Sequence, residues 1–105
     1  MHAFITHMRA REGQREEVIR LTTVMLEKTQ SEPGIPVYVF STAADSPDDF
    51  WFYDIYESDE ARADHEASEE FGRTMGALMQ VAELVSVTKL DPYGPMKITP
   101  PSSAP

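Results

Sequence analysis

The chain has 105 residues and a formal net charge of −9, from nine Lys and Arg against 18 Asp and Glu. This length fits a single domain, and the negative charge argues against a nucleic-acid partner, because a phosphate backbone requires a basic surface. The absence of cysteine excludes disulfides, thiolate nucleophiles and cysteine-ligated metals. The sequence has no signal-peptide pattern and no apolar run near the roughly 20 residues of a membrane span, so we expect a cytoplasmic protein without membrane contact.

The acidic side chains concentrate between Asp45 and Glu70, where 11 of them accompany one basic residue, Arg62. A solvated surface is the ordinary explanation of such a stretch. A cation-binding surface is the alternative.

The first third of the chain predicts a strand and then a helix. Residues 2 to 9 alternate, with Phe4 on one side and His7 on the other. In residues 14 to 30 the apolar side chains recur at helical spacing. The pair Pro33-Gly34 should end this helix, because proline cannot continue it and glycine can supply a positive φ.

A hairpin is predicted next, with strands over residues 36 to 42 and 50 to 56 and a polar turn over residues 44 to 49. Aromatic and β-branched residues dominate both strands, as a pleated surface favours. Alternation in the second strand places Trp51, Tyr53 and Ile55 on one face and Phe50, Phe52 and Tyr56 on the other.

The last third predicts two helical runs and a final strand. Ser58 is a suitable N-cap for a short helix ending near Ala67, and Ser68 caps or kinks the chain before the second run. The apolar stripe of that run is Phe71, Met75, Leu78, Met79 and Ala82. With a strand over residues 83 to 90, the order is β-α-β-β-α-β. We therefore expect an α+β fold with an antiparallel sheet, the ferredoxin-like split βαβ arrangement.

The end of the chain differs in composition from the rest. Residues 92 to 105 contain five prolines and little apolar surface to bury, so we expect an extended or disordered tail after a domain of residues 1 to 91.

Both faces of the predicted sheet are apolar. In a split βαβ domain the helices cover one face, and the other would expose more apolar surface than a soluble monomer tolerates. Pairing that face with its copy across a two-fold axis buries it, so we expect a homodimer. The alternative is a monomer whose tail folds across the sheet.

Three ordered segments carry a family resemblance. They are Glu32-Pro-Gly, Phe50-Trp-Phe-Tyr-Asp-Ile-Tyr-Glu-Ser-Asp-Glu-Ala, and Asp64-His65-Glu-Ala-Ser-Glu-Glu-Phe71. Together they resemble the antibiotic biosynthesis monooxygenase family, over residues 2 to 91. The resemblance implies a dimeric α/β barrel. It leaves the chemistry open, since such folds host several activities: cofactor-independent oxidation of hydroquinones and aromatic polyketides, haem degradation, and isomerisation of a phosphorylated sugar-like signal.

A cofactor-independent monooxygenase acting with molecular oxygen on a hydroquinone-like or polyketide-like aromatic is the function we expect. It needs an apolar pocket, aromatic walls and a group that accepts a phenolic proton, a task that suits histidine. His65, which matches the family's helix histidine, is the first candidate for that group and His7 is the second. The candidate substrate-binding residues, in a pocket between the sheet and the helices, are Tyr38, Trp51, Tyr53, Phe71 and Met75.

No cofactor or metal is expected, because the sequence lacks a glycine-rich dinucleotide turn and a helical pair of histidines. The alternative function is a non-catalytic small-molecule-binding or structural dimer, in which His65 is a buried hydrogen-bonding residue and the aromatics are core. The haem-degrading branch is disfavoured, because residues 71 to 82 contain no histidine. The isomerase branch is disfavoured because few basic residues are available for a phosphate.

Overall fold

The computed structural model describes residues 1 to 99 and shows four strands and three helices. In chain order they are β1 (His2–Ala10), α1 (Arg15–Thr29), β2 (Val37–Ala43), β3 (Ser46–Tyr56), α2 (Asp59–Ala67), α3 (Glu69–Val81) and β4 (Ala82–Leu90). The expected ferredoxin-like α+β fold is confirmed, with its second helix divided into α2 and α3. Within the described part of the chain, no helix has the length and apolar character needed to cross a membrane.

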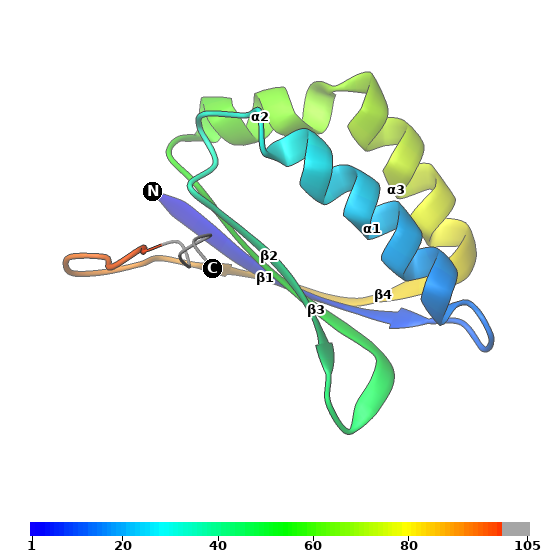
Figure 1. Cartoon of the computed structure of the whole chain (residues 1–105). Coiled ribbons are helices and arrows are strands. Elements are labelled where there is room, and N and C mark those ends of the chain that lie inside the picture. Colours follow the sequence, from blue (N-terminus) through cyan, green and yellow to red (C-terminus); the bar gives the residue numbers. More distant parts are fainter. Residues whose placement is uncertain (100–105) are drawn as a thin grey trace, which may run out of the picture.

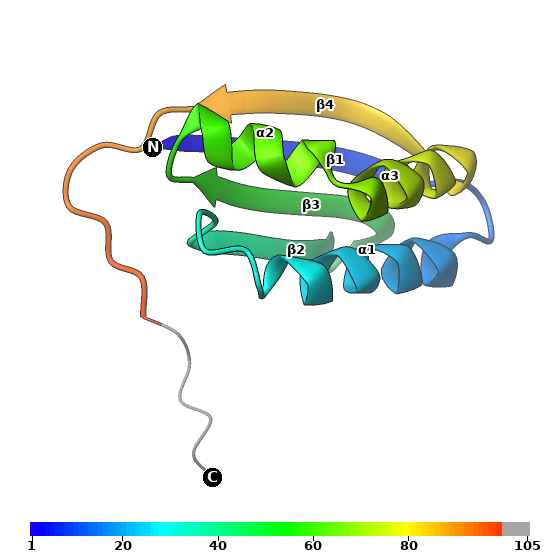
Figure 2. The same cartoon turned by 90° about the horizontal axis from the view of Figure 1, so that it is seen from above.

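The four strands form one antiparallel sheet in the order β2-β3-β1-β4. All three helices lie on the same side of this sheet, with α1 packed against α3 (Figures 1 and 2). We call the side that the helices cover the inner face and the opposite side the outer face. No helix of residues 1 to 99 covers the outer face.

The core lies between the inner face and the helices. Its buried side chains are Met8, Ala10, Val18, Leu21, Met25, Phe50, Phe52, Leu78 and Ala82. Strand positions two residues apart supply Phe50 and Phe52, and helical spacing supplies Val18, Leu21 and Met25. The periodicity of the sequence thus accounts for which side chains meet in the core.

Ser68 divides the second helical region as the sequence predicts. Its backbone is extended, with φ −68° and ψ 146°, and its hydroxyl accepts a hydrogen bond from the Phe71 N–H at 3.2 Å. Ser58 caps α2 in the same way, accepting from the Ala61 N–H at 3.1 Å. Each serine satisfies an N–H that the first helical turn leaves unpaired.

The hairpin turn is shorter than predicted, because Ser46 to Asp49 belong to β3. Asp49 pairs with Arg9 across the β1–β3 ladder and accepts hydrogen bonds from Arg9, His7 and Ser46. These long-range contacts hold an acidic segment in a strand although its local composition favours a turn. Pro47 lies in the irregularity of the β2–β3 ladder, where its missing N–H removes no regular hydrogen bond.

One extra residue, Val85, lies in β4 at a bulge. The register runs from His7 opposite Ser86 to Met8 opposite Leu84, skipping Val85. Because a bulge shifts the alternation of side chains, Leu84 and Val87 both face the inner side and border the cavity described below.

The chain beyond β4 has neither helix nor strand in residues 91 to 99. Part of it, including Tyr93 and Ile98, borders the outer face beside Val37 and Tyr53. Residues 100 to 105 of the expected tail lie outside the described residues.

Packing of α1 can be tested by shortening Leu21, a core residue that is 7% exposed and borders no cavity. We expect Leu21→Ala to lower the free energy of unfolding by about 2–5 kcal/mol, through lost burial and the void left behind. Val24 lies on the same helix and is 45% exposed, so Val24→Ala should change the free energy of unfolding by less than about 0.5 kcal/mol. Urea denaturation of both variants measures the difference, and equal losses would contradict this packing.

Candidate active site

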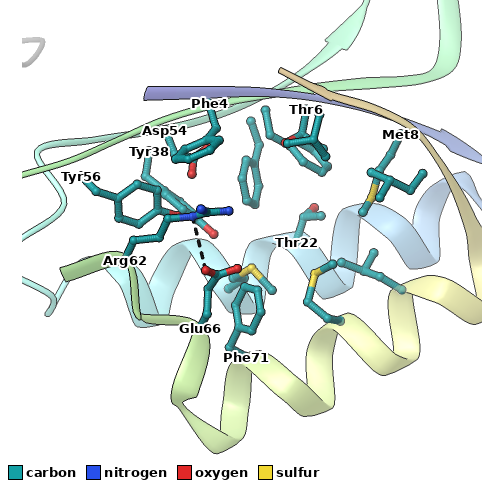
Figure 3. A pocket seen from close by; sticks show the side chains of 17 residues that line it. Phe4, Thr6, Met8, Thr22, Tyr38, Asp54, Tyr56, Arg62, Glu66 and Phe71 are labelled. Atoms are coloured by element: carbon teal, nitrogen blue, oxygen red, sulfur yellow. Dashed lines mark ion pairs between the residues drawn. The ribbon is translucent and has the colours of Figure 1, made fainter. Parts of the chain in front are cut away.

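A cavity of about 160 Å³ lies between the inner face and the helices (Figure 3). The apolar part of its wall consists of Phe4, Met8, Met25, Phe40, Phe52, Phe71, Met75, Leu78, Leu84 and Val87. Thr6 and Thr22 are the hydroxyl-bearing residues within this part. The remaining lining residues are polar or charged and gather at one end.

The polar end of the cavity, which we define as Tyr38, Asp54, Tyr56, Arg62 and Glu66, combines the sheet with α2. Asp54 on β3 lies opposite Phe4 on β1 and Tyr38 on β2 in the strand register.

Arg62 and Glu66 reach the polar end from α2 (Figure 3). The Arg62 guanidinium carbon lies 3.9 Å from the centroid of the Phe4 ring, and Arg62 Nε lies 3.3 Å from Glu66 Oε1. The cation–π contact and the ion pair therefore place charged side chains of α2 beside an aromatic wall.

His65 lies behind Tyr38 and does not border the cavity. It is 2% exposed, its Nδ1 is 2.7 Å from Glu32 Oε2, and its Nε2 is 3.2 Å from the Tyr38 hydroxyl. A carboxylate can only accept, so Nδ1 of the neutral ring carries the proton and Nε2 accepts from Tyr38. These hydrogen bonds link Glu32, His65 and Tyr38 in series. This hydrogen-bonded chain, Glu32–His65–Tyr38, ends at a hydroxyl group on the cavity wall.

Gly34 explains how Glu32 reaches His65. The sequence predicts a positive φ at this glycine, but Gly34 is not among the residues with positive φ. A Cβ at Gly34 would instead lie 2.6 Å from the Ala61 Cβ, so the absence of a side chain lets the turn approach α2 closely. The Gly34 carbonyl also accepts the Glu57 N–H at 2.9 Å.

Charge and burial set the protonation of this chain of groups. Burial alone raises the pKa of the Glu32 carboxyl, but hydrogen bonds from Lys28 and His65 outweigh it and hold that pKa below its ordinary value. Burial raises the pKa of Tyr38 and of Tyr56 above the ordinary tyrosine value. Both hydroxyls therefore keep their protons near neutral pH and can donate hydrogen bonds.

Asp54 is a site residue that our sequence reasoning missed. Burial raises the pKa of its carboxyl, and hydrogen bonding with Tyr56, together with His65 and Arg62, offsets only part of that effect. The signal was present, because the alternation that turns Phe52 and Tyr56 inward also turns Asp54 inward. A carboxyl on an apolar strand face is unusual enough to mark a candidate site.

The structure separates the seven residues that the sequence analysis grouped. Tyr38, Phe71 and Met75 border the cavity, and His65 touches it through Tyr38. Trp51 and Tyr53 were expected to line the cavity but do not. Side chains alternate along β3, so these two project from the outer face while Phe52 and Asp54 project from the inner face.

His7 also lies on the outer face. Its ring stacks on Trp51 with centroids 4.0 Å apart, and its Nε2 is 2.7 Å from Asp49 Oδ1. Hydrogen bonds from Ser46 and His7 hold the pKa of Asp49 at about 2, so this carboxylate is charged at neutral pH. This cluster is separated from the cavity by the sheet itself. Within residues 1 to 99, no group of three His, Asp or Glu side chains is placed to hold a metal ion.

Comparison with known proteins identifies the class. The family model for antibiotic biosynthesis monooxygenase matches residues 1–77, and the chain belongs to this family. No curated protein matches the sequence significantly.

Solved structures share the fold at low sequence identity. A Deinococcus radiodurans protein named only as a candidate antibiotic biosynthesis monooxygenase has a TM-score of 0.82 at 18% identity, over 94% of this chain and 99% of that one. A Chloroflexus aurantiacus protein with the same designation has a TM-score of 0.78 at 23% identity, covering 93% and 98%. A Bacteroides thetaiotaomicron protein of unknown function has a TM-score of 0.79 at 21% identity, over 85% of this chain and 94% of that one. At these identities the likeness shows the fold alone.

The hydrogen bonds that Glu32 accepts from Lys28 and His65 predict a pH-dependent stability. A carboxyl whose folded pKa is depressed stabilises the fold above its unfolded pKa, here near 4.5, and the contribution is lost as pH falls through the folded value. We expect the free energy of unfolding of the wild type to fall more steeply than that of Glu32→Gln between about pH 5 and pH 3. Urea denaturation across this range measures it.

Glu27→Gln is the matched control, since Glu27 is exposed on α1 and should keep the wild-type pH dependence. Parallel curves for the wild type and Glu32→Gln would show that Glu32 has no stabilising partner in the folded chain.

Proposed function

We propose that the protein is a cofactor-independent monooxygenase that acts with molecular oxygen on a hydroquinone-like aromatic. The observation that carries this proposal is the cavity itself, which joins apolar and aromatic walls to a hydroxyl backed by a buried histidine. Membership of the antibiotic biosynthesis monooxygenase family supports the reaction class.

The size of the cavity favours a single ring over a multi-ring polyketide. An apolar cavity of roughly 150 Å³ accommodates a benzene ring, and this one measures about 160 Å³. A fused polyketide would require the walls to move apart. A hydroquinone fits the volume and brings hydroxyl groups that match the polar end.

The reaction balances without a cofactor. One molecule of hydroquinone and one of dioxygen give one molecule of hydroxyquinone and one of water. The ring loses four electrons, and dioxygen takes all four as one of its atoms enters the product and the other leaves as water. The protein must bind the ring, exclude bulk water and handle protons, because an ionised phenol can itself pass an electron to oxygen.

The chain Glu32–His65–Tyr38 is suited to part of this task. The Tyr38 hydroxyl can donate a hydrogen bond to a substrate oxygen or relay a proton to His65 Nε2, and Glu32 stabilises the imidazolium that would result. Phe71 and Met75 form the helix side of the ring site. His65 is thus the first candidate for the proton-handling group, acting through Tyr38.

Oxygen uptake by purified, metal-free protein with a panel of hydroquinones tests the function. We expect consumption of oxygen by the wild type and a loss of roughly 100- to 10,000-fold in turnover for His65→Ala, the range of general acid–base assistance. Tyr38→Phe should also slow turnover, since it removes the relay hydroxyl.

The matched control is His7→Ala, which removes a histidine from the outer face and should retain wild-type turnover. If no hydroquinone is oxidised, the protein is instead a binding module. If His65→Ala remains fully active, the Glu32–His65–Tyr38 chain is structural.

A homodimer formed through the outer face is the second part of the proposal. Val39, Trp51 and Tyr53 are 50%, 40% and 36% exposed on this face. Burying this apolar surface against a second chain would stabilise the dimer by about 25 cal/mol for each Å² removed from water. A two-fold axis would place each patch against its own copy.

A charge on the outer face should dissociate the dimer. Sedimentation at micromolar concentration should give the mass of two chains for the wild type and of one chain for Tyr53→Asp, because an unpaired charge buried in an interface costs several kcal/mol. Val24→Asp, on the helix side and 45% exposed, should remain dimeric. A one-chain mass for the wild type would refute this mode of assembly.

A further inference from the structure

Asp54 lies at the polar end on the sheet side of the cavity. It is the only carboxyl that the sheet contributes to the cavity wall within residues 1 to 99. It projects from the inner face of β3 between Phe52 and Tyr56, opposite Phe4 and Tyr38 on the neighbouring strands. Because β3 is paired with a strand on each side, the backbone that carries this carboxyl is held in place relative to the cavity.

No salt bridge holds Asp54. The other carboxylate of the polar end, Glu66, is paired with Arg62, whereas no cation of residues 1 to 99 lies within 4.0 Å of the Asp54 carboxyl. A structural carboxylate in an apolar wall is normally neutralised by such a partner. Its hydrogen bond is with the uncharged Tyr56 hydroxyl, so Asp54 remains able to exchange a proton with a ligand.

Its neighbours suit it to receive a proton. The hydroxyls of Tyr38 and Tyr56 face the same end and retain their own protons, because burial raises the pKa of both. The Tyr56 hydroxyl is therefore a donor, and Tyr38 can accept a substrate proton only if it passes its own proton to His65. Burial raises the pKa of the Asp54 carboxyl above its ordinary value, which makes its carboxylate a stronger base.

We infer that Asp54 is the catalytic base that contacts the substrate and takes the proton of its ring hydroxyl. The inference rests on the proposed function and adds a second acid–base group to it. The Tyr38 hydroxyl, which donates to His65 Nε2 in the free protein, then turns its single proton to the same oxygen and stabilises the phenolate as it forms.

The steps balance with Asp54 ionised at the beginning and the end. The O–H bond of the substrate breaks and its proton passes to Asp54. The phenolate gives one electron to dioxygen, and the radical and superoxide combine into a C–O bond. Asp54 returns its proton to the outer oxygen of this peroxide. The proton on the same ring carbon then passes to Asp54 as the O–O bond breaks, and this carbon becomes a carbonyl. The departing hydroxide takes that proton from Asp54 and leaves as water.

Kinetics with Asp54→Asn provides the first test. We expect kcat for hydroquinone oxidation to fall by roughly 100- to 10,000-fold, with a much smaller change in KM, because the lost interaction acts mainly in the transition state. Asp54→Ser checks that the effect follows loss of the carboxyl, and circular dichroism checks that both variants fold. Asp48→Asn, an exposed position on the same strand, should match the wild type.

Anaerobic binding of phenol provides a readout that needs no turnover. Phenol remains neutral well below its pKa of about 10, and an ionised carboxylate binds its hydroxyl more strongly than a protonated one. We expect the Kd of the wild type to fall by about five- to tenfold from a pH at which Asp54 is protonated to a higher pH at which it is ionised.

The other titratable or charged groups at this end are Tyr38, Tyr56, Arg62 and Glu66, with His65 behind Tyr38. They are unchanged in Asp54→Asn, so a Kd that no longer depends on pH in that variant identifies Asp54 as the source.

The outcomes separate the two proposals. If the wild type oxidises hydroquinones and Asp54→Asn does so equally fast, or if both bind phenol with the same pH dependence, the inference about Asp54 is overturned and the proposed function stands. If the wild type consumes no oxygen with any hydroquinone, the proposed function itself fails.

Discussion

The hydrogen bond between Glu32 and His65 joins two segments that are far apart in the sequence, and the polar end of the cavity depends on it. It fixes the turn after α1 to α2, where Gly34 permits close approach to Ala61. It also sets the tautomer of His65, which in turn orients the Tyr38 hydroxyl on the cavity wall. Because both partners are largely buried, the contact is stronger and more sharply oriented than a surface pair.

The sheet separates two kinds of aromatic surface. Residues of one parity, such as Phe52, face the helices and enclose the cavity, whereas residues of the other parity, such as Trp51, face away from it. In the proposed account the inner face performs the chemistry and the outer face holds two chains together. In this proposal the stacked and hydrogen-bonded His7 takes no part in the chemistry, since the sheet stands between it and any ring in the cavity.

The sequence predicts the fold well, because hydrophobic periodicity and serine caps are local signals. It predicts the site only in part. Alternation along β3 places Trp51 on the opposite face from Phe52 and also turns Asp54 inward. The predicted pocket follows aromatic character instead of this alternation, and it therefore combines residues from both faces of the sheet. The bulge at Val85 and the strand conformation of Asp49 depend on contacts with β1, and no local pattern encodes them. The cavity size likewise follows from packing between distant segments.

In the proposed function a phenolic ring binds between the inner face and the helices with its hydroxyl at the polar end. A crystal structure of the protein with hydroquinone, prepared without oxygen, is the most direct test of this binding mode. We expect the ring between Phe52 and Phe71, with one hydroxyl within hydrogen-bond distance of Asp54 and Tyr38. Hydroquinone bound on the outer face beside Trp51, with the cavity between sheet and helices unfilled, would contradict it.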